Sequence, residues 1–577
     1  MVMTALAGFS SCSKDFLKKP LGSDTNVDSI FSTSQKAESA IAQAYAQSLA
    51  SGITIVDWDN NRTYGLRSGT MDEISGESNA TKFNWEDDWI MQRSGMTADD
   101  GSGIPLSDDG FNFNYTAIRH DYLVMENIDR VKDMSADEKQ QVKAEMMTLI
   151  AYRYEEMFKR YGGVPIVSKS LSVEDTIKIP RATLQQTLDF IVSLCDQAAP
   201  SLPDKYPDQW VGRVTKGIAL AIKAEALMYA ARPLFNSASP YMNLGASNNL
   251  ICFGNVDQAR WQKAADAAKA VIDWALANSY TIINTGHPLD DYGTAVATPG
   301  NAEVLLAYKN ESGSYGGNGD YYDPHYQSGG ANSMSYYQLL QYYKADGTEQ
   351  TWPGSEQHPY AEYADKIQEM EPRYKASAMG AGIDAWNNPN STYWSSTTVS
   401  NGSNWDGRGG TEACGRRVKF WYHAGTRSWF EFPIYRLAEF YLDLAEADNE
   451  LGQADQSLQY LNVIRKRAGL PDVTETDQAK LRKIIQREWA VEFYLEGHRL
   501  FDVKHWKLAD IGNGIIGGPK KSFIYTYTNG QYGYVPADYV SYSVQVVYTG
   551  FWSPNQYLDP FPASEVAKGY LMQNPGY

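Results

Sequence analysis

The sequence contains only four cysteines, and no two of them form a Cys-x-x-Cys pair. Zinc fingers and thioredoxin-like redox sites depend on such pairs, so the sequence predicts neither. Three of the cysteines form an odd set far from the N-terminus, and we expect these to include buried thiols: Cys195, Cys252 and Cys414.

Positive charge is also scarce. Lys and Arg number 51 against 69 Asp and Glu, which gives a net charge of −18. Binding to nucleic acid requires a basic surface, and so does electrostatic adhesion to anionic lipid. The composition therefore argues against both kinds of partner. After the N-terminus, no apolar run is long enough to span a bilayer.

The short motifs of common enzymes are missing. The sequence has no HExxH, no P-loop, no G-x-S-x-G and no dinucleotide-binding glycine pattern. Its seven histidines lack the spacing of metal ligands. The stretch from Asp57 to Asn61 begins like a calcium loop, but Arg62 stands where that loop needs glycine. We predict no cofactor and no catalytic metal, and the sequence leaves a structural calcium ion open.

The best case for catalysis is a row of three glutamates. Glu488, Glu492 and Glu496 recur every four residues, which places their side chains on one face of a helix. A pair of carboxylates could hydrolyse a glycosidic bond. Three basic residues lie nearby in the sequence: Arg487, Arg499 and Lys504. We therefore favour ion pairing over catalysis for the three glutamates.

Helical periodicity dominates what is present. Apolar residues recur at steps of three and four over about 35–50, 115–278 and 433–506. Within the last block we expect a helix from about Ile434 to Leu451. Ser135 with Glu138 forms a capping box, and Thr183 and Thr215 are expected to cap two further helices. Short connections between these helices predict a mainly α fold of tetratricopeptide-like antiparallel pairs.

Two long regions, 53–114 and 280–432, lose this periodicity and are rich in turn-forming residues. We interpret both as loop insertions on the helical frame. The second carries short strands at Glu303–Tyr308 and Arg417–Tyr422, and it should not form a core alone. Alternation in the sequence SYSVQVVYT predicts a β-hairpin near the C-terminus.

Aromatic residues are abundant, with 40 Tyr and 15 Trp, and many lie in these insertions. Some will fill the core. In a loop, however, an aromatic ring can cover the C–H face of a sugar while amides and charged groups bind its hydroxyls. The residues we predict to bind such a ligand are Trp58, Asn61, Arg62, Asp72, Trp85, Trp89, Tyr315, Tyr321, Tyr322, Trp386 and Trp405.

The N-terminus contains the remaining cysteine. Cys12 follows the small and apolar run MTALAGFSS and precedes the polar run SKDFLKKPLGS. This is how a signal peptide meets a lipid-modified cysteine, although Phe9 stands three residues before it and no basic segment precedes the run. We expect residues 1–12 to be the end of a signal peptide and Cys12 to carry the lipid anchor, with residues 13–577 forming one domain.

Several motifs together resemble the SusD/RagB family of Bacteroidetes surface lipoproteins. They are, in family order, the start around Cys12, a helix ending in GGVP, the stretch GRVTKG, the run YRLAEFYLDLAEADNELG with QREWAVEFYLEGHRLFDVKHW, and the tail ending in NPGY. The resemblance covers nearly the whole chain. It implies a non-catalytic protein that captures oligosaccharides for a SusC-like TonB-dependent transporter in the outer membrane. It also implies that the regions 53–114 and 280–410 meet the ligand.

Three alternatives stay open. The same fold could capture peptides, as one branch of the family is thought to do. An all-helical glycoside hydrolase and a plain repeat scaffold for protein partners are the other two. The tryptophan-rich insertions favour a glycan ligand over the alternatives.

Overall fold

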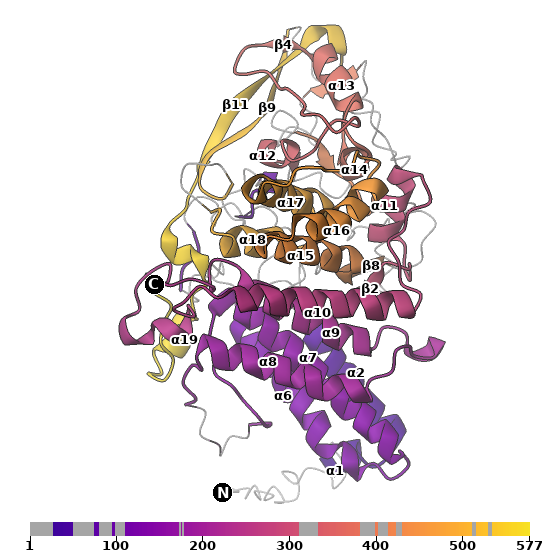
Figure 1. The fold of residues 1–577 in the computed structure, drawn as a ribbon, viewed down its shortest axis with the longest axis vertical. Coiled ribbons are helices and arrows are strands. Elements are labelled where there is room, and N and C mark those ends of the chain that lie inside the picture. Colours follow the sequence, from indigo (N-terminus) through magenta and orange to yellow (C-terminus); the bar gives the residue numbers. More distant parts are fainter. Residues whose placement is uncertain are drawn as a thin grey trace, which may run out of the picture.

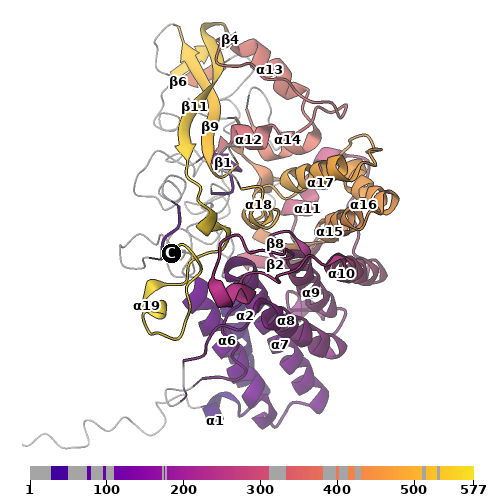
Figure 2. The same ribbon diagram turned by 60° about the vertical axis from the view of Figure 1, so that its left-hand side comes forward.

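The computed structural model describes residues 27–49, 74–79, 95–98, 110–171, 175, 178–310, 333–380, 398–401, 414–422, 430–509, 515–528 and 533–577. The fold is mainly α, as predicted (Figure 1). Two stacks of helices lie one above the other, and a long β-ribbon runs along one side of the upper stack (Figures 1 and 2).

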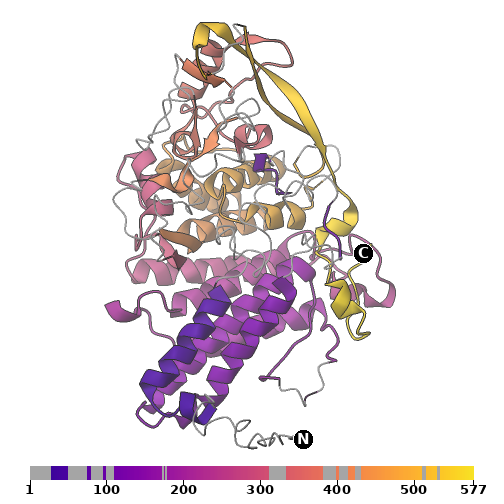
Figure 3. The same ribbon diagram turned by 180° about the vertical axis from the view of Figure 1, so that it is seen from behind.

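The N-terminal stack packs each helix against the next one in the sequence. Figure 3 shows its helices from behind as one layered bundle. Its members are α2 (Ser34–Leu49), α6 (Gly110–Asn127), α7 (Ala136–Tyr161), α8 (Leu184–Ala198), α9 (Lys216–Ala231) and α10 (Gln258–Ala277). A bilayer span would need a longer or more apolar helix than any in the described part of the chain.

Side-chain caps fix where two of these helices begin. The Ser135 hydroxyl accepts the Glu138 N–H at 3.2 Å, while the Glu138 carboxylate accepts the Ser135 N–H at 2.7 Å. Thr183 and Gln186 repeat the same reciprocal pair at the start of α8. Both capping predictions are confirmed. Thr215 does precede α9, but its side chain makes no capping hydrogen bond, so that detail was wrong.

The C-terminal stack rests on α10 and differs from expectation at its start. It contains β8 (Phe430–Arg436), α15 (Leu437–Glu450), α16 (Ala454–Arg467), α17 (Gln478–Glu492) and α18 (Arg499–His505). Ile434 belongs to β8 and not to the helix, which begins at Leu437. The cause is non-local, because β8 pairs with β2 (Val304–Asn310) in an antiparallel sheet. The predicted strand near Glu303–Tyr308 is thereby confirmed.

The middle of the chain is more regular than we expected. The region 280–432 includes α11 (Pro288–Ala297), α12 (Tyr336–Leu339), α13 (Tyr360–Gln368) and α14 (Pro372–Ser377). The predicted strand at Arg417–Tyr422 was largely wrong. Only Arg416–Arg417 is extended, and Lys419–Trp421 forms a 3₁₀ turn. The α6 helix also begins at Gly110, inside the region that we had assigned to a loop.

The predicted C-terminal hairpin is present as a long ribbon. Strand β9 (Gly518–Tyr527) pairs with β11 (Val540–Gly550), and a bulge shifts the register between Val546 and Tyr548. Strand β4 (His358–Pro359) adds to the far side of β11. The ribbon therefore attaches the C-terminal region to the middle insertion.

The ribbon and the middle insertion share a second core, separate from that of the helices, which is dense in tyrosine. Its tyrosines are Tyr292, Tyr342, Tyr360, Tyr363, Tyr374, Tyr422, Tyr494, Tyr525 and Tyr542. The ring of Tyr363 lies 5.2 Å from that of Phe523 and 5.5 Å from that of Tyr542. Many tyrosines of the described chain thus serve packing. Cys195, Cys252 and Cys414 are buried free thiols, as expected.

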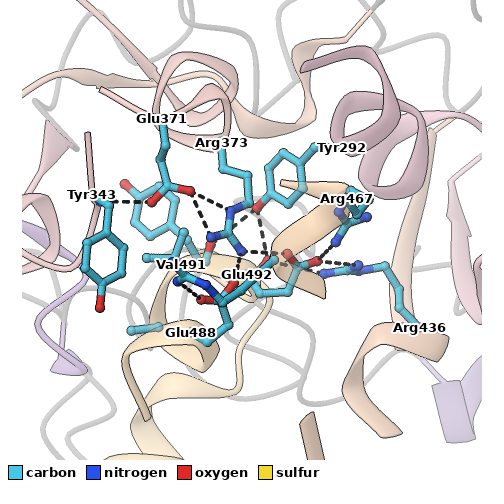
Figure 4. A network of polar contacts seen from close by, with 12 residues as sticks. Tyr292, Tyr343, Glu371, Arg373, Arg436, Arg467, Glu488, Val491 and Glu492 are labelled. Carbon is cyan, nitrogen blue, oxygen red and sulfur yellow. Dashed lines mark hydrogen bonds and ion pairs between the residues drawn. The ribbon is translucent and has the colours of Figure 1, made fainter. Parts of the chain in front are cut away.

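The three glutamates in the row on α17 and just beyond it lie in a buried ion network (Figure 4). Glu492 contacts Arg373 at 3.1 Å, Arg436 at 3.0 Å and also Arg467. Glu488 pairs with Arg373 at 2.6 Å, and Glu496 pairs with Lys419 at 2.6 Å. Ion pairing is confirmed, but its partners were not foreseen. The basic residues expected nearby bind elsewhere: Arg487 to Glu349, Arg499 to the Tyr337 hydroxyl and Lys504 to Asp559.

Replacing Glu492 by Gln tests how much the fold depends on this network. The change leaves three buried guanidinium groups short of a negative charge, so the free energy of unfolding should fall by roughly 3–5 kcal/mol. Glu349→Gln is the matched control, because it removes an exposed ion pair worth less than about 1 kcal/mol. Chemical denaturation of both variants measures the difference, and equal losses would contradict the prediction.

Candidate functional site

The early and middle insertions meet in one small sheet. Its strands are β1 (Ser78–Asn79), β3 (Ser333–Met334), β7 (Arg416–Arg417) and β5 (Ala378–Met379), in that spatial order. Every pairing is antiparallel. Figure 2 shows β1 beside α12 and β9, far from the helices next to it in sequence. The two regions that we predicted to bind ligand are therefore joined by backbone hydrogen bonds.

Hydrogen bonds accepted by Glu77 and donated by Ser335 anchor this sheet. The Ser335 N–H donates to the Glu77 carbonyl at 3.0 Å, and the Ser335 hydroxyl donates to the Gly76 carbonyl. The Glu77 carboxylate is buried and accepts the Leu495 N–H at 3.2 Å. The anchor thus ties the early insertion both to α12 and to the turn after α17.

A buried amine lies next to this anchor. The Lys520 ammonium donates to the Ile515 carbonyl, which faces Gly76. Burial lowers the pKa of Lys520 to about 7, because the charged amine loses contact with water.

The strand directions determine where the insertion segments leave the sheet. Asn79 pairs with Ser333, so the chain after β1 and the chain before β3 leave from the same end. Met379 pairs with Arg416, so the chain after β5 and the chain before β7 share the opposite end. Two-residue strands separate these ends by only about 7 Å.

All the residues that we predicted to bind ligand lie outside the described residues. Trp85 and Trp89 follow β1 in the sequence, and the residues from Tyr315 to Tyr322 precede β3. Trp386 follows β5, and Trp405 precedes β7. The others lie between α2 and β1: Trp58, Asn61, Arg62 and Asp72. The lipidation residue Cys12 and the calcium-like stretch after Asp57 are also outside the described chain.

The residues that build the anchor could not be predicted from the sequence. Gly76, Glu77 and Ser335 lie in regions that we assigned to loops, and two-residue strands carry no periodicity to detect. Ser335 offered the one usable signal. It caps α12 by accepting the Gln338 N–H at 3.0 Å, which is ordinary capping chemistry.

The N-terminal stack contains a groove. It has a volume of about 430 Å³ and lies between α8, α9 and α10. Leu188, Leu220 and Leu227 give it an apolar wall, while Lys223 and Asp266 lie among its polar residues. It contains none of the predicted ligand residues, and one of its walls is α10, on which the C-terminal stack rests.

Gly76 gives a direct test of the anchor. Its φ is +85°, and an added Cβ would lie 2.1 Å from the Ile515 carbonyl oxygen. Gly254 has a similar φ of +76° but no heavy atom within 4 Å of such a Cβ. Both Gly→Ala changes impose about 1–2 kcal/mol of left-handed strain. Gly76→Ala alone should add a steric loss, which thermal melting would detect. A Gly254→Ala variant that melts as low as Gly76→Ala would count against this account.

Comparisons with known proteins agree with this architecture. A family model described as "SusD family" matches residues 302–577, and one described as "Starch-binding associating with outer membrane" matches residues 24–226. No curated protein sequence matches the chain significantly.

Several solved structures share the fold. A SusD-like protein from Bacteroides fragilis is 22% identical, covers 95% of this chain and 98% of its own, and has a TM-score of 0.72. A SusD-like carbohydrate binding protein from the same species is 18% identical over 94% and 99% of the two chains, with a TM-score of 0.65. A laminarin binding SusD-like protein is 16% identical over 95% and 100%, with a TM-score of 0.54. On the family models, the shared fold and the motifs of its own sequence, this chain belongs to the SusD/RagB family.

Proposed function

We propose that this protein captures an oligosaccharide at the cell surface without altering it and passes it to a SusC-like TonB-dependent transporter. The convergence of the insertions is the observation that carries the proposal. Four segments that each contain Trp or Tyr begin or end at one sheet of two-residue strands. Membership of the SusD/RagB family supports the same function.

Convergence matters because one aromatic platform binds sugar weakly. A ring that covers on the order of 50 Å² of C–H surface contributes roughly 1–2 kcal/mol. A micromolar dissociation constant needs about 8 kcal/mol, so several platforms must act on one ligand. A sheet that gathers the segments supplies this condition, whereas independent loops on distant helices would not.

The three glutamates that offered the best case for hydrolysis are held in buried ion pairs. Glu488, Glu492 and Glu496 are buried, and each pairs with Arg or Lys. Four cationic neighbours lower the pKa of Glu492 strongly in spite of its burial, so it cannot serve as a general acid. This supports binding without catalysis.

Trp85→Ala and Trp89→Ala test the binding face. Each change should weaken affinity for the preferred glycan about tenfold, because it removes one stacking platform. Trp210→Ala is the control, since Trp210 is 37% exposed but lies on the N-terminal stack. Calorimetry against a panel of polysaccharides, oligosaccharides and peptides measures all three variants.

The outcomes separate the alternatives. If Trp85→Ala and Trp89→Ala both bind the glycan as tightly as the wild type, the proposed binding face is wrong. Binding of peptides in place of glycans would assign the protein to the peptide-capturing branch, and release of reducing sugar from a bound polysaccharide would identify a hydrolase. Co-purification with a TonB-dependent transporter tests the proposed partner.

We further propose that Cys12 carries the lipid that holds the protein on the outer membrane. Cys12→Ala in cells should abolish labelling by radioactive palmitate and release the protein from the membrane fraction, because no acyl chain would then anchor it. The buried Cys252 gives the matched control, since Cys252→Ala should leave the membrane association unchanged. Continued labelling of Cys12→Ala would overturn this assignment.

A further inference from the structure

A second group of buried charges lies between the two helical stacks. Glu225 on α9 meets Glu439 on α15, and His498 approaches from the residue just before α18. One side-chain ligand atom from each residue lies within 4.8 Å of the others. Each of the three comes from a different helical element, so the stacking of the helices alone brings them together.

Glu439 is the group whose surroundings are incomplete. Glu439 is only 1% exposed, and its Oε2 has no hydrogen-bond partner among the described residues. A buried carboxylate oxygen without a partner costs several kcal/mol relative to one in water. In the Glu492 network, by contrast, both oxygens of the central carboxylate contact arginine. Glu439 Oε2 therefore lacks the arginine partners that stabilise the carboxylate of Glu492.

Nearby side chains supply more negative than positive charge. Lys159 pairs with Glu225 and Glu155 at 3.2 Å and with Glu156 at 2.5 Å. Glu439 is not among its partners. Arg232 is taken by Glu446 at 2.9 Å and Asp502 at 2.6 Å. Glu439 thus lies near the carboxylates of Glu225 and Asp443, and it forms no ion pair with either Lys159 or Arg232.

The His498 ring is held in place by aromatic neighbours. It packs 4.8 Å from the ring of Phe493 and 5.8 Å from that of Trp489, which limits its orientation. Glu225 is oriented too, since its Oε2 accepts the Tyr435 hydroxyl at 2.7 Å.

A small cavity adjoins two of the three residues. Its volume is about 50 Å³, and Glu225 and His498 are among the residues that line it, whereas Glu439 is not. This is enough for a water molecule, which needs roughly 10–15 Å³ on the same measure. A metal bound by three side chains could therefore complete its coordination with water.

We propose that Glu225, Glu439 and His498 form a binding site for a divalent transition-metal ion of the zinc type. Two carboxylate oxygens and one imidazole nitrogen suit Zn²⁺, Mn²⁺ or Co²⁺, whereas Ca²⁺ prefers six to eight oxygen ligands. Small side-chain shifts must close the ligand atoms around bonds of about 2.0–2.2 Å. The ion would neutralise the excess charge and fasten α9 of the lower stack to α15 of the upper one.

Metal retention by the purified full chain tests the proposal. After treatment with a chelator and dialysis against Zn²⁺, the wild type should retain one equivalent and melt at a higher temperature than the chelated protein. Glu439→Gln keeps the shape of the side chain, and His498→Ala removes the nitrogen ligand. Each should weaken Zn²⁺ binding at least about tenfold and abolish the melting shift. Co²⁺ in place of Zn²⁺ should give visible absorption bands that both variants lose.

His358→Asn is the control for surface binding. His358 Nδ1 lies 2.7 Å from Glu362 on an exposed part of α13, an arrangement that can hold an adventitious ion. This variant should bind Zn²⁺ as the wild type does. Three results would overturn the proposal: no stoichiometric metal in the wild type, a melting shift that survives both Glu439→Gln and His498→Ala, or a response to Ca²⁺ but not to Zn²⁺. If protons alone balance the cluster, Glu439→Gln will be as stable as the wild type and neither will respond to metal.

Discussion

The buried carboxylate of Glu492 is the constraint on which the upper half of this protein depends. It lies among three arginines that come from three separate parts of the chain: α14, the end of β8 and α16. Burying such charges is expensive unless every one is paired, so the arrangement tolerates only one relative placement of these elements. The ion network adds little net stability compared with apolar residues. It destabilises arrangements in which these elements are misplaced, because they would leave a buried charge unpaired.

The turn that follows α17 connects the ion network to the small sheet at the candidate site. Leu495 in that turn has a φ of 64°, a strained value for a residue with a side chain. Its N–H is bound by Glu77, the residue that anchors the insertion sheet. On the other side, the Lys419 ammonium donates to the carbonyl groups of Glu492 and Tyr494 at 3.0 and 2.6 Å. The ion network and the sheet anchor are therefore parts of one structure, only a few residues apart.

Sequence reasoning succeeded where the signal was local. The long helices, the capping boxes at Ser135 and Thr183 and the alternation of β11 each depend on residues that are neighbours in the chain. It failed at Ile434, where pairing with a distant strand overrides an apparently helical pattern. Ion pairing of Glu492 was predicted from basic residues nearby in the sequence, but its actual arginine partners could not be predicted, because they come from other elements of the chain.

The candidate site shows the same division. Aromatic composition predicted a ligand chemistry, yet the described tyrosines such as Tyr363 and Tyr542 belong to a core, so composition alone does not separate the two roles. The predicted contacts, from Trp58 to Trp405, stay predictions. No pattern could have shown that the segments carrying them start from one sheet, since strands of two residues have no recognisable period.

The value of such a short sheet lies in placement more than in stability. Halving the length of a flexible loop saves only about 0.6 kcal/mol of closure entropy. A stacked ring contributes roughly 1–2 kcal/mol, and that gain adds to others only when the rings reach the same ligand. Fixing the ends of four segments on one sheet about 14 Å across reduces the ordering that a ligand must impose on binding. Glu77 connects that sheet to the turn after Glu492, so the placement of the segment ends depends on the buried charges around Glu492.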